Sequence, residues 1–270
     1  MNNFLILLTL LFLACGKDPF KRVEELNSFR VLAITTSSPE LNILGSLNTT
    51  VTPYISDING GGRITAGTVE MCLDPGVTFG AEVKCDHDPY KYSSSYNFDS
   101  TTYSNNLYSG LGSSVTLTLP NYIFSGKSER EKYNGVAVIV IFTFSVDNLT
   151  VKAFRRILVT NRTTLNQNPT VTQINVNGSA ITQKPNKNDE ISLSYGNVES
   201  YNYEQVDGTV ETKSESFKIA WFTSSGNINY PKTEVGKNAK YTSQPNSGSF
   251  LIVGVVRDDR GGVSIIEKKF

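Results

Sequence analysis

Few side chains in this sequence have the types and spacing that catalysis requires. The only histidine among the 270 residues is His87, in the acidic stretch CDHDP, and no G-x-S-x-G turn is present to carry a nucleophile. The glycine-rich stretch NGGGRITAG lacks G-K-[ST], and no expected helix follows it, which argues against a phosphate-binding loop. We therefore predict no catalytic residue and no cofactor. A carboxylate pair of the kind that glycosidases use remains as an alternative, although no Asp or Glu pair stands out by its spacing.

Cys15 could carry a covalent modification. The apolar run from Phe4 to Leu13 is too short to span a bilayer, but it suits the central region of a secretory signal peptide. The run ends in Phe12-Leu13-Ala14-Cys15, which resembles the lipobox of bacterial lipoproteins. The resemblance implies a signal peptide over residues 1–14, a lipid on Cys15 and a tether over residues 15–28. The alternative is a buried N-terminal element with a chance cysteine.

The resemblance to lipoproteins also implies a location. Gly16 follows the cysteine where an Asp would favour retention in the inner membrane, so we expect an outer-membrane protein held by several acyl chains. The 25 Lys and Arg residues balance the 25 Asp and Glu residues. Because no basic stripe appears either, nucleic acid is not an expected partner. The membrane is expected as a partner through the lipid alone.

Cys72 and Cys85 are the only other cysteines, in EMCLDPGVTFGAEVKCDHDP. An exported chain meets an oxidising compartment, and two cysteines allow a single pairing, so we expect a disulfide. A metal site that combines them with His87 is the alternative, but the spacing matches no zinc pattern. We predict no metal site.

Calcium is a further possibility at two acidic turns. Asp86 lies near Asp88, and Asp258 precedes Asp259. Carboxylate oxygens on turns can bind calcium, but aspartate is also common in turns for its own backbone contacts.

The stretch DPYKYSSSYNFDSTTYSNNLYSGLG, within residues 89–112, is rich in tyrosine, serine, asparagine and glycine. Antibody loops use this mixture because tyrosine offers a large amphipathic contact at low entropic cost. We expect an irregular loop here, and the candidate binding residues are Tyr90, Tyr92, Tyr96, Tyr103 and Tyr108. The alternatives are a solvated loop or an extra hairpin with stacked tyrosines. If binding does not occur here, YGNVESYNYEQVDG in the second half is the next candidate.

The elements that position these residues are expected to be strands. Alternating stretches rich in Val, Ile, Thr, Tyr and Phe predict an all-β protein, and no segment shows helical periodicity. We place strands at 29–36, 47–55, 67–73, 114–119, 135–146, 150–160, 170–176, 190–195, 216–223, 238–242, 249–256 and 262–268. Polar residues at 163–169 indicate a linker between two β-sandwich domains, at 29–162 and 170–270.

The second half resembles the immunoglobulin-like and PKD-like modules of bacterial surface proteins. The similarity is carried by NPTVTQINVNG, AWFTSSG and VVRDDRGGVS. It implies a sandwich with Trp221 in its core, the alternative being a sugar-binding platform. The whole chain resembles the uncharacterised two-domain lipoproteins of predatory and gliding Gram-negative bacteria. We therefore expect a non-catalytic envelope protein that binds or scaffolds a protein or glycan, with an envelope hydrolase as the alternative.

The lipid assignment predicts the behaviour of one variant. Cys15→Ala should abolish incorporation of labelled palmitate, because no other residue can form the thioether, whereas Cys72→Ser should keep it. Metabolic labelling followed by detergent partitioning measures this. Labelled Cys15→Ala protein in the detergent phase would contradict the assignment.

Overall fold

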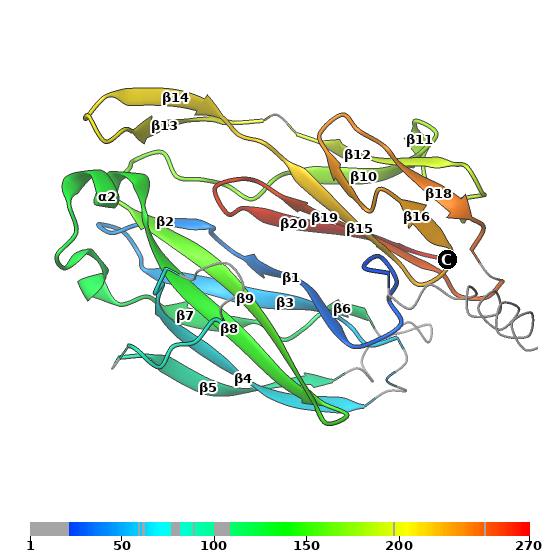
Figure 1. Ribbon diagram of the computed structural model, residues 1–270, viewed down its shortest axis with the longest axis horizontal. Helices are drawn as coiled ribbons and strands as arrows, with labels where there is room; N and C mark the ends of the chain where they lie inside the picture. Colours follow the sequence, from blue (N-terminus) through cyan, green and yellow to red (C-terminus); the bar gives the residue numbers. More distant parts are fainter. Residues whose placement is uncertain are drawn as a thin grey trace, which may run out of the picture.

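The computed structural model describes residues 22–58, 60, 63–76, 82–88, 90–99, 109–196, 198–245 and 247–270. The chain is all-β, as the sequence predicts, and forms two tandem immunoglobulin-like β-sandwich modules (Figure 1). Over these residues, no helix has the length and apolar character to cross a membrane. Cys15, Tyr103 and Tyr108 lie outside the described residues.

The first module contains two facing sheets. One has the order β2-β9-β8-β4-β5, in which β2 runs parallel to β9 and the other pairs are antiparallel. Its strands are β2 (Glu40–Asn42), β9 (Leu149–Thr160), β8 (Val136–Val146), β4 (Ile64–Leu73) and β5 (Tyr92–Asp99). In the other sheet β3 pairs with all three neighbours. Its strands are β1 (Arg30–Thr36), β3 (Asn48–Ser56), β6 (Ser109–Leu111) and β7 (Val115–Thr118).

Strand β8 is covered on both faces, which explains its almost continuous apolar sequence. Val138, Val140 and Phe142 point into the core between the sheets. Ile139 and Ile141 point to the opposite face, where the Cys72–Cys85 disulfide covers them. The predicted disulfide is therefore confirmed, with the two Cα atoms 5.6 Å apart, and it packs against the outer side of the sheet.

Two short helical segments connect β7 to β8. They are the 3₁₀ turn η2 (Asn121–Phe124) and the helix α2 (Glu129–Asn134). Helix α2 begins with a capping box, in which Ser128 accepts from the Glu131 N–H and Glu131 accepts from the Ser128 N–H. It ends at Gly135, whose φ of 106° suits glycine.

The second module has a five-stranded and a four-stranded sheet. The first has the order β11-β10-β12-β18-β16, with strands at Ser179–Ala180, Val171–Val176, Glu190–Tyr195, Ala239–Ser243 and Asn227–Asn229. The second has the order β17-β15-β19-β20, with strands at Lys232–Glu234, Lys218–Thr223, Leu251–Arg257 and Val263–Lys269. Trp221 lies in the core between them, 1% exposed, and its indole N–H donates to Thr233 Oγ1 at 3.2 Å. It is a core residue and not a surface platform.

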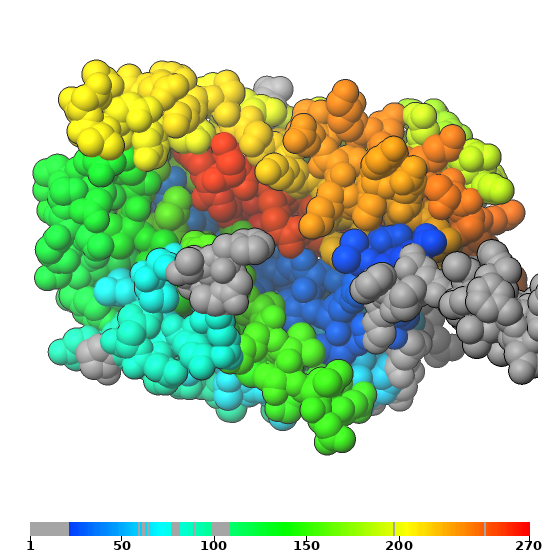
Figure 2. All heavy atoms as spheres, in the orientation of Figure 1, coloured from blue at the N-terminus to red at the C-terminus, as the bar shows by residue number. Residues whose placement is uncertain are grey.

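A separate hairpin, β13 (Ser200–Glu204) with β14 (Val210–Ser214), extends from the second module towards the first. Figure 2 shows this hairpin lying over the part of the first module that contains α2. The Asn134 side chain at the end of α2 donates to the Glu204 carbonyl at 2.8 Å and accepts from the Glu204 N–H at 2.9 Å. The hairpin is thus attached to the first module.

The two modules also share an apolar interface. Leu32, Ala33 and Tyr54 of the first module pack with residues of the four-stranded sheet of the second. Those residues are Leu251, Val253, Val255 and Val263. Both faces of β19 are consequently buried, one inside its own module and one against the first module.

Part of the predicted tether is not a free spacer. Leu26 is 2% exposed in the interface between the modules, and its N–H donates to the Thr223 carbonyl at 3.0 Å. The Thr223 N–H donates to the Glu24 carbonyl at 2.9 Å. Residues 24–26 therefore add a short parallel bridge to the end of β15. The expectation of a spacer as far as residue 28 is wrong over this segment.

The expectation of an irregular loop over residues 89–112 is also wrong where the structure describes it. Residues 92–99 form β5, fully paired with β4, and 109–111 form β6. Tyr96 is 4% exposed, contacts the Phe142 ring edge-on at 4.9 Å, and donates to the Ser113 carbonyl at 2.9 Å. Alternation along β5 turns Tyr96 inward.

This placement predicts a large effect on stability from Tyr96. Tyr96→Ala should lower the free energy of unfolding by about 3–5 kcal/mol, because it empties a packed site in the core. Tyr92→Ala, on the same strand but 37% exposed, should cost less than about 1 kcal/mol. Urea unfolding followed by circular dichroism measures both. Equal effects would show that Tyr96 is not a core residue.

Candidate functional site

The turn between β19 and β20 has a fixed shape that directs one side chain at the first module. Asp258 Oδ1 accepts from the backbone N–H groups of Arg260, at 2.9 Å, and Gly262, at 2.5 Å. Gly262 has no room for a side chain, since a Cβ there would lie 2.0 Å from Asp258 Oδ2 and 2.8 Å from the Gln167 carbonyl oxygen. The stretch RDDRGG thus forms a rigid support for Arg260.

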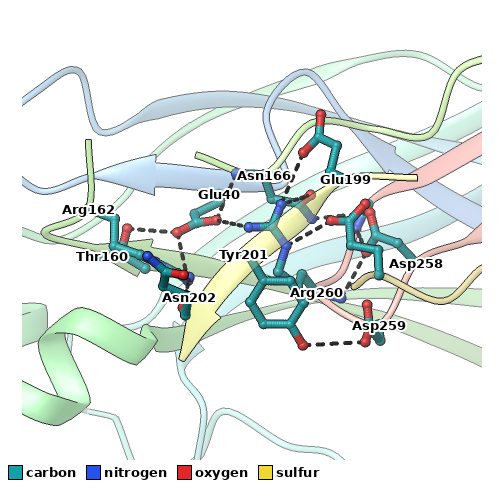
Figure 3. Close-up of polar contacts among 12 residues, drawn as sticks. Glu40, Thr160, Arg162, Asn166, Glu199, Tyr201, Asn202, Asp258, Asp259 and Arg260 are labelled. Carbon is teal, nitrogen blue, oxygen red and sulfur yellow. Dashed lines mark hydrogen bonds and ion pairs between the residues drawn. The ribbon is translucent and has the colours of Figure 1, made fainter. Parts of the chain in front are cut away.

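Arg260 lies at the centre of a polar cluster between the modules (Figure 3). It is 7% exposed. Its Nε donates to Glu215 Oε1 at 2.8 Å, and its Nη2 donates to Asn166 Oδ1 at 2.7 Å and to Glu199 Oε2 at 3.2 Å. The guanidinium also lies 4.7 Å from the centre of the Tyr201 ring. Partners on all sides make burial of the charge tolerable.

Glu40 of β2 is the first module's main contribution to this cluster. It is 1% exposed. Its Oε1 accepts from Thr160 Oγ1 at 2.8 Å and pairs with Arg162 Nη2 at 3.0 Å, while its Oε2 accepts from the Asn166 N–H at 2.8 Å. The same Oε2 lies 3.9 Å from Arg260 Nη1. One carboxylate thus links the first module, the linker and the turn of the second module.

The predicted linker, residues 163–169, takes part in this junction. Asn166 is fully buried, and its side-chain amide also donates to Asp258 Oδ2 at 3.2 Å. Asn168 donates to the Thr36 carbonyl at 2.7 Å and accepts from the Val263 N–H at 3.0 Å. The polar composition of the linker reflects buried hydrogen bonds.

Arg162 forms a second link between the modules. Its Nη1 donates to the Asn202 carbonyl at 3.1 Å, and its guanidinium lies 5.7 Å from the centre of the Tyr133 ring. The side chain is 9% exposed, and its Nε has no hydrogen-bond partner within the described residues. Arg162 and the Asn134 contacts hold the β13–β14 hairpin against the end of the first module.

A cavity of about 430 Å³ opens between the hairpin and the first module. One wall comes from the end of α2 and the segment after β9, namely Tyr133, Asn161, Arg162, Thr163 and Thr164. The other comes from the second module, namely Glu199, Ser200, Tyr201, Asn202 and Arg260. We call this the junction cavity. Its volume falls in the range of small-molecule sites.

Burial in the cluster changes the pKa of Glu215 and of Tyr201. It raises the pKa of the Glu215 carboxyl, an effect that Arg260 opposes. It also raises the pKa of the Tyr201 phenol, which lies 3.4 Å from Asp259 Oδ2. Both shifts follow from the loss of solvation of the charged form. The burial that raises these two pKa values comes from the same packing that brings the two modules together.

The acidic turns considered for calcium have other roles in the structure. Asp258 accepts from its own turn, and Asp88 accepts from the N–H groups of Leu73 and Tyr90. His87 is exposed, with Nε2 3.0 Å from the Leu73 carbonyl. Within the residues that are described, no group of three His, Cys, Asp or Glu side chains could hold a metal ion.

Of the tyrosines predicted to bind a partner, the three that the structure describes do not form one surface. Tyr96 is in the core, and Tyr92 is partly exposed on the edge strand β5. Tyr90 is 74% exposed and rests against Tyr122, with ring centres 5.3 Å apart. None of these three lines the junction cavity. Tyr103 and Tyr108 fall in the part that is not described.

The second candidate stretch, YGNVESYNYEQVDG, does reach the cavity. It supplies Glu199, Ser200, Tyr201 and Asn202. Sequence reasoning missed Glu40, Arg162 and Arg260. For Arg260 the sequence holds a signal, because the Asp and Gly residues of RDDRGG are typical of a turn, but nothing in it indicates that this turn faces another module.

Comparisons with known proteins do not extend this picture. No protein-family model matches the chain, and no curated protein sequence does. Among solved structures, red sea bream transglutaminase aligns with 89% of the chain at 11% identity and a TM-score of 0.29, and the chain spans about a third (31%) of its length. The fibronectin(III)-like modules of Clostridium thermocellum CbhA align over 88% of the chain and 92% of their own, at 10% identity and a TM-score of 0.22. With TM-scores this low, neither similarity bears on function.

The cluster predicts that Arg260 stabilises the junction. Arg260→Ala should lower the free energy of unfolding by about 3–5 kcal/mol, because it leaves Glu215 buried without its cation and the Asn166 side-chain oxygen without its donor. Arg156→Ala is the control, since the Arg156 side chain is 42% exposed and its ion pair with Asp74 should contribute less than about 1 kcal/mol. Urea denaturation provides the comparison. A cost for Arg260→Ala no larger than that of the control would show that the cluster does not hold the modules together.

Proposed function

We propose that this chain is a non-catalytic, lipid-anchored protein of the bacterial outer membrane that binds a protein or glycan partner at the cell envelope. The observation that carries the proposal is the junction cavity. Its walls come from both modules and are fixed by buried polar contacts. A site fixed before binding loses little conformational entropy when a ligand enters.

The position of the N-terminal segment supports a receptor that faces away from the membrane. A lipid on Cys15 would be joined to Arg22 by six residues, which span at most about 25 Å when extended. In Figure 1 the docked segment before β1 lies at the right-hand end, near the C-terminus. Helix α2 and the β13–β14 hairpin, which border the cavity, lie at the left-hand end. The anchor would therefore hold the cavity away from the lipid surface.

The alternative, an envelope hydrolase, needs a carboxyl group that is free to transfer a proton. Burial raises the pKa of the Glu215 carboxyl, but Glu215 does not line the cavity and is bound to Arg260. Glu199 does line the cavity and shares the same arginine. In this arrangement the carboxylates stabilise the turn, which favours binding over catalysis.

Partner capture with matched variants tests the proposal. Thr164 is an exposed residue in the cavity wall, so Thr164→Trp should fill the cavity without disturbing the core. Ser93, exposed on β5, provides the control Ser93→Trp. Full-length tagged lipoprotein, expressed in its membrane and solubilised, is used to capture partners from envelope extract, which mass spectrometry then identifies.

We expect the wild type and Ser93→Trp to retain the same partner and Thr164→Trp to lose it. Loss of the partner in Ser93→Trp alone would show that the binding surface lies on β5. Capture that neither variant alters would refute the junction cavity as the binding site.

A further inference from the structure

We propose that the junction cavity binds a short neutral glycan, of the size of one or two sugar rings. This inference rests on the proposed function and specifies its ligand. The first step concerns unused hydrogen-bonding groups. The side chains of Asn161, Thr163, Thr164 and Ser200 line the cavity and make no hydrogen bond to described residues. A ligand with several hydroxyl groups can use all of them, since a hydroxyl both donates and accepts.

Arg162 adds a buried donor to the same wall. Its side chain is more than nine-tenths buried, and its Nε–H has no partner among the described residues. Leaving such a group unsatisfied is unfavourable. The Nε is itself shielded from solvent, so a ligand oxygen could reach it only if the Arg162 side chain moved, and the hydroxyl and amide groups named above remain the direct partners.

The charge balance of the junction argues against an anionic ligand. Arg162 and Arg260 already contact three carboxylates, those of Glu40, Glu199 and Glu215. The nearby Arg155 is buried and Arg257 is half-buried, and neither lines the cavity; Asp258 lies near Arg155, and Asp259 accepts from the Tyr201 hydroxyl. The two guanidinium groups of the cavity wall thus meet three carboxylates, which leaves no excess positive charge there to attract a phosphate, a sulfate or a sugar acid.

The two aromatic rings supply the apolar part of the site. Tyr133 and Tyr201 stand on opposite walls, and each has an arginine over one face, Arg162 and Arg260 respectively. These cation–π contacts hold the rings in place. A sugar ring combines C–H faces, which pack on aromatic surfaces, with hydroxyl groups at its edge. The cavity presents the same combination in complementary form.

The experiment uses the full-length lipoprotein in a detergent without a sugar headgroup. Isothermal titration calorimetry measures the binding of maltotetraose, cellotetraose, xylotetraose and chitotetraose, with tetragalacturonate as the acidic comparator. Variants Tyr201→Ala and Thr164→Trp alter the cavity, and Ser93→Trp is the control. Circular dichroism melting establishes that each variant is folded before titration.

We expect at least one neutral tetrasaccharide to bind, with a dissociation constant raised tenfold or more in both cavity variants and unchanged in Ser93→Trp. Binding of tetragalacturonate alone, or of no saccharide, would overturn the inference. The proposed function would still stand if Thr164→Trp abolished capture of a protein from envelope extract. Failure of both assays would remove the binding site as well as its ligand.

Discussion

Burying the guanidinium of Arg260 removes a full charge from water, and only partners that meet it from several sides can offset that cost. Those partners come from segments far apart in the chain. They are Glu40 in β2, Asn166 in the linker, and Glu199, Tyr201 and Glu215 around the hairpin. Because each partner is needed, the modules have little freedom to shift relative to one another. The walls of the junction cavity, which come from both modules, are therefore held in fixed positions as well.

The apolar interface works in the same direction but is less specific. Strand β19 has side chains buried on both faces, with Ile252 and Val256 in its own module and Val253 and Val255 against the first. Apolar contacts of this kind favour close approach of the two modules without fixing their relative orientation. The hydrogen bonds and ion pairs of the RDDRGG turn supply the orientation. Together they explain why a linker as short and polar as residues 163–169 is largely ordered by its surroundings.

The sequence predicted well the strands whose apolar or alternating pattern arises from packing within a single sandwich. The strands expected at 135–146 and 190–195 match β8 and β12 within a residue, since each alternates or is apolar throughout. Strand β5 was missed because YSSSYNFD has few apolar residues, and only Tyr96 and Phe98 reach the core. Composition alone cannot separate such an edge strand from a loop.

The candidate site was harder to predict, because it is formed by packing between modules. Tyr201 lies in YGNVESYNYEQVDG, the second candidate stretch for binding. Nothing in the local sequence indicates that Glu40 and Arg260, more than two hundred residues apart, lie 3.9 Å from each other. The burial of Leu26 was equally hidden, since its neighbours in the sequence are charged and suggest a solvated spacer.

The docking of residues 24–26 on β15 determines how the protein would carry mechanical load. A pull applied to the chain from before residue 22 would be resisted by the Arg30 side chain, which donates to the Val23 carbonyl at 2.6 Å, by two backbone hydrogen bonds to Thr223, and by the buried Leu26 side chain. Because the bridge at Glu25 is parallel to β15, a pull along the strand would load these contacts in shear, so that they share the force. Tension would therefore enter both modules at this point, and the linker at 163–169 would not carry it between them alone.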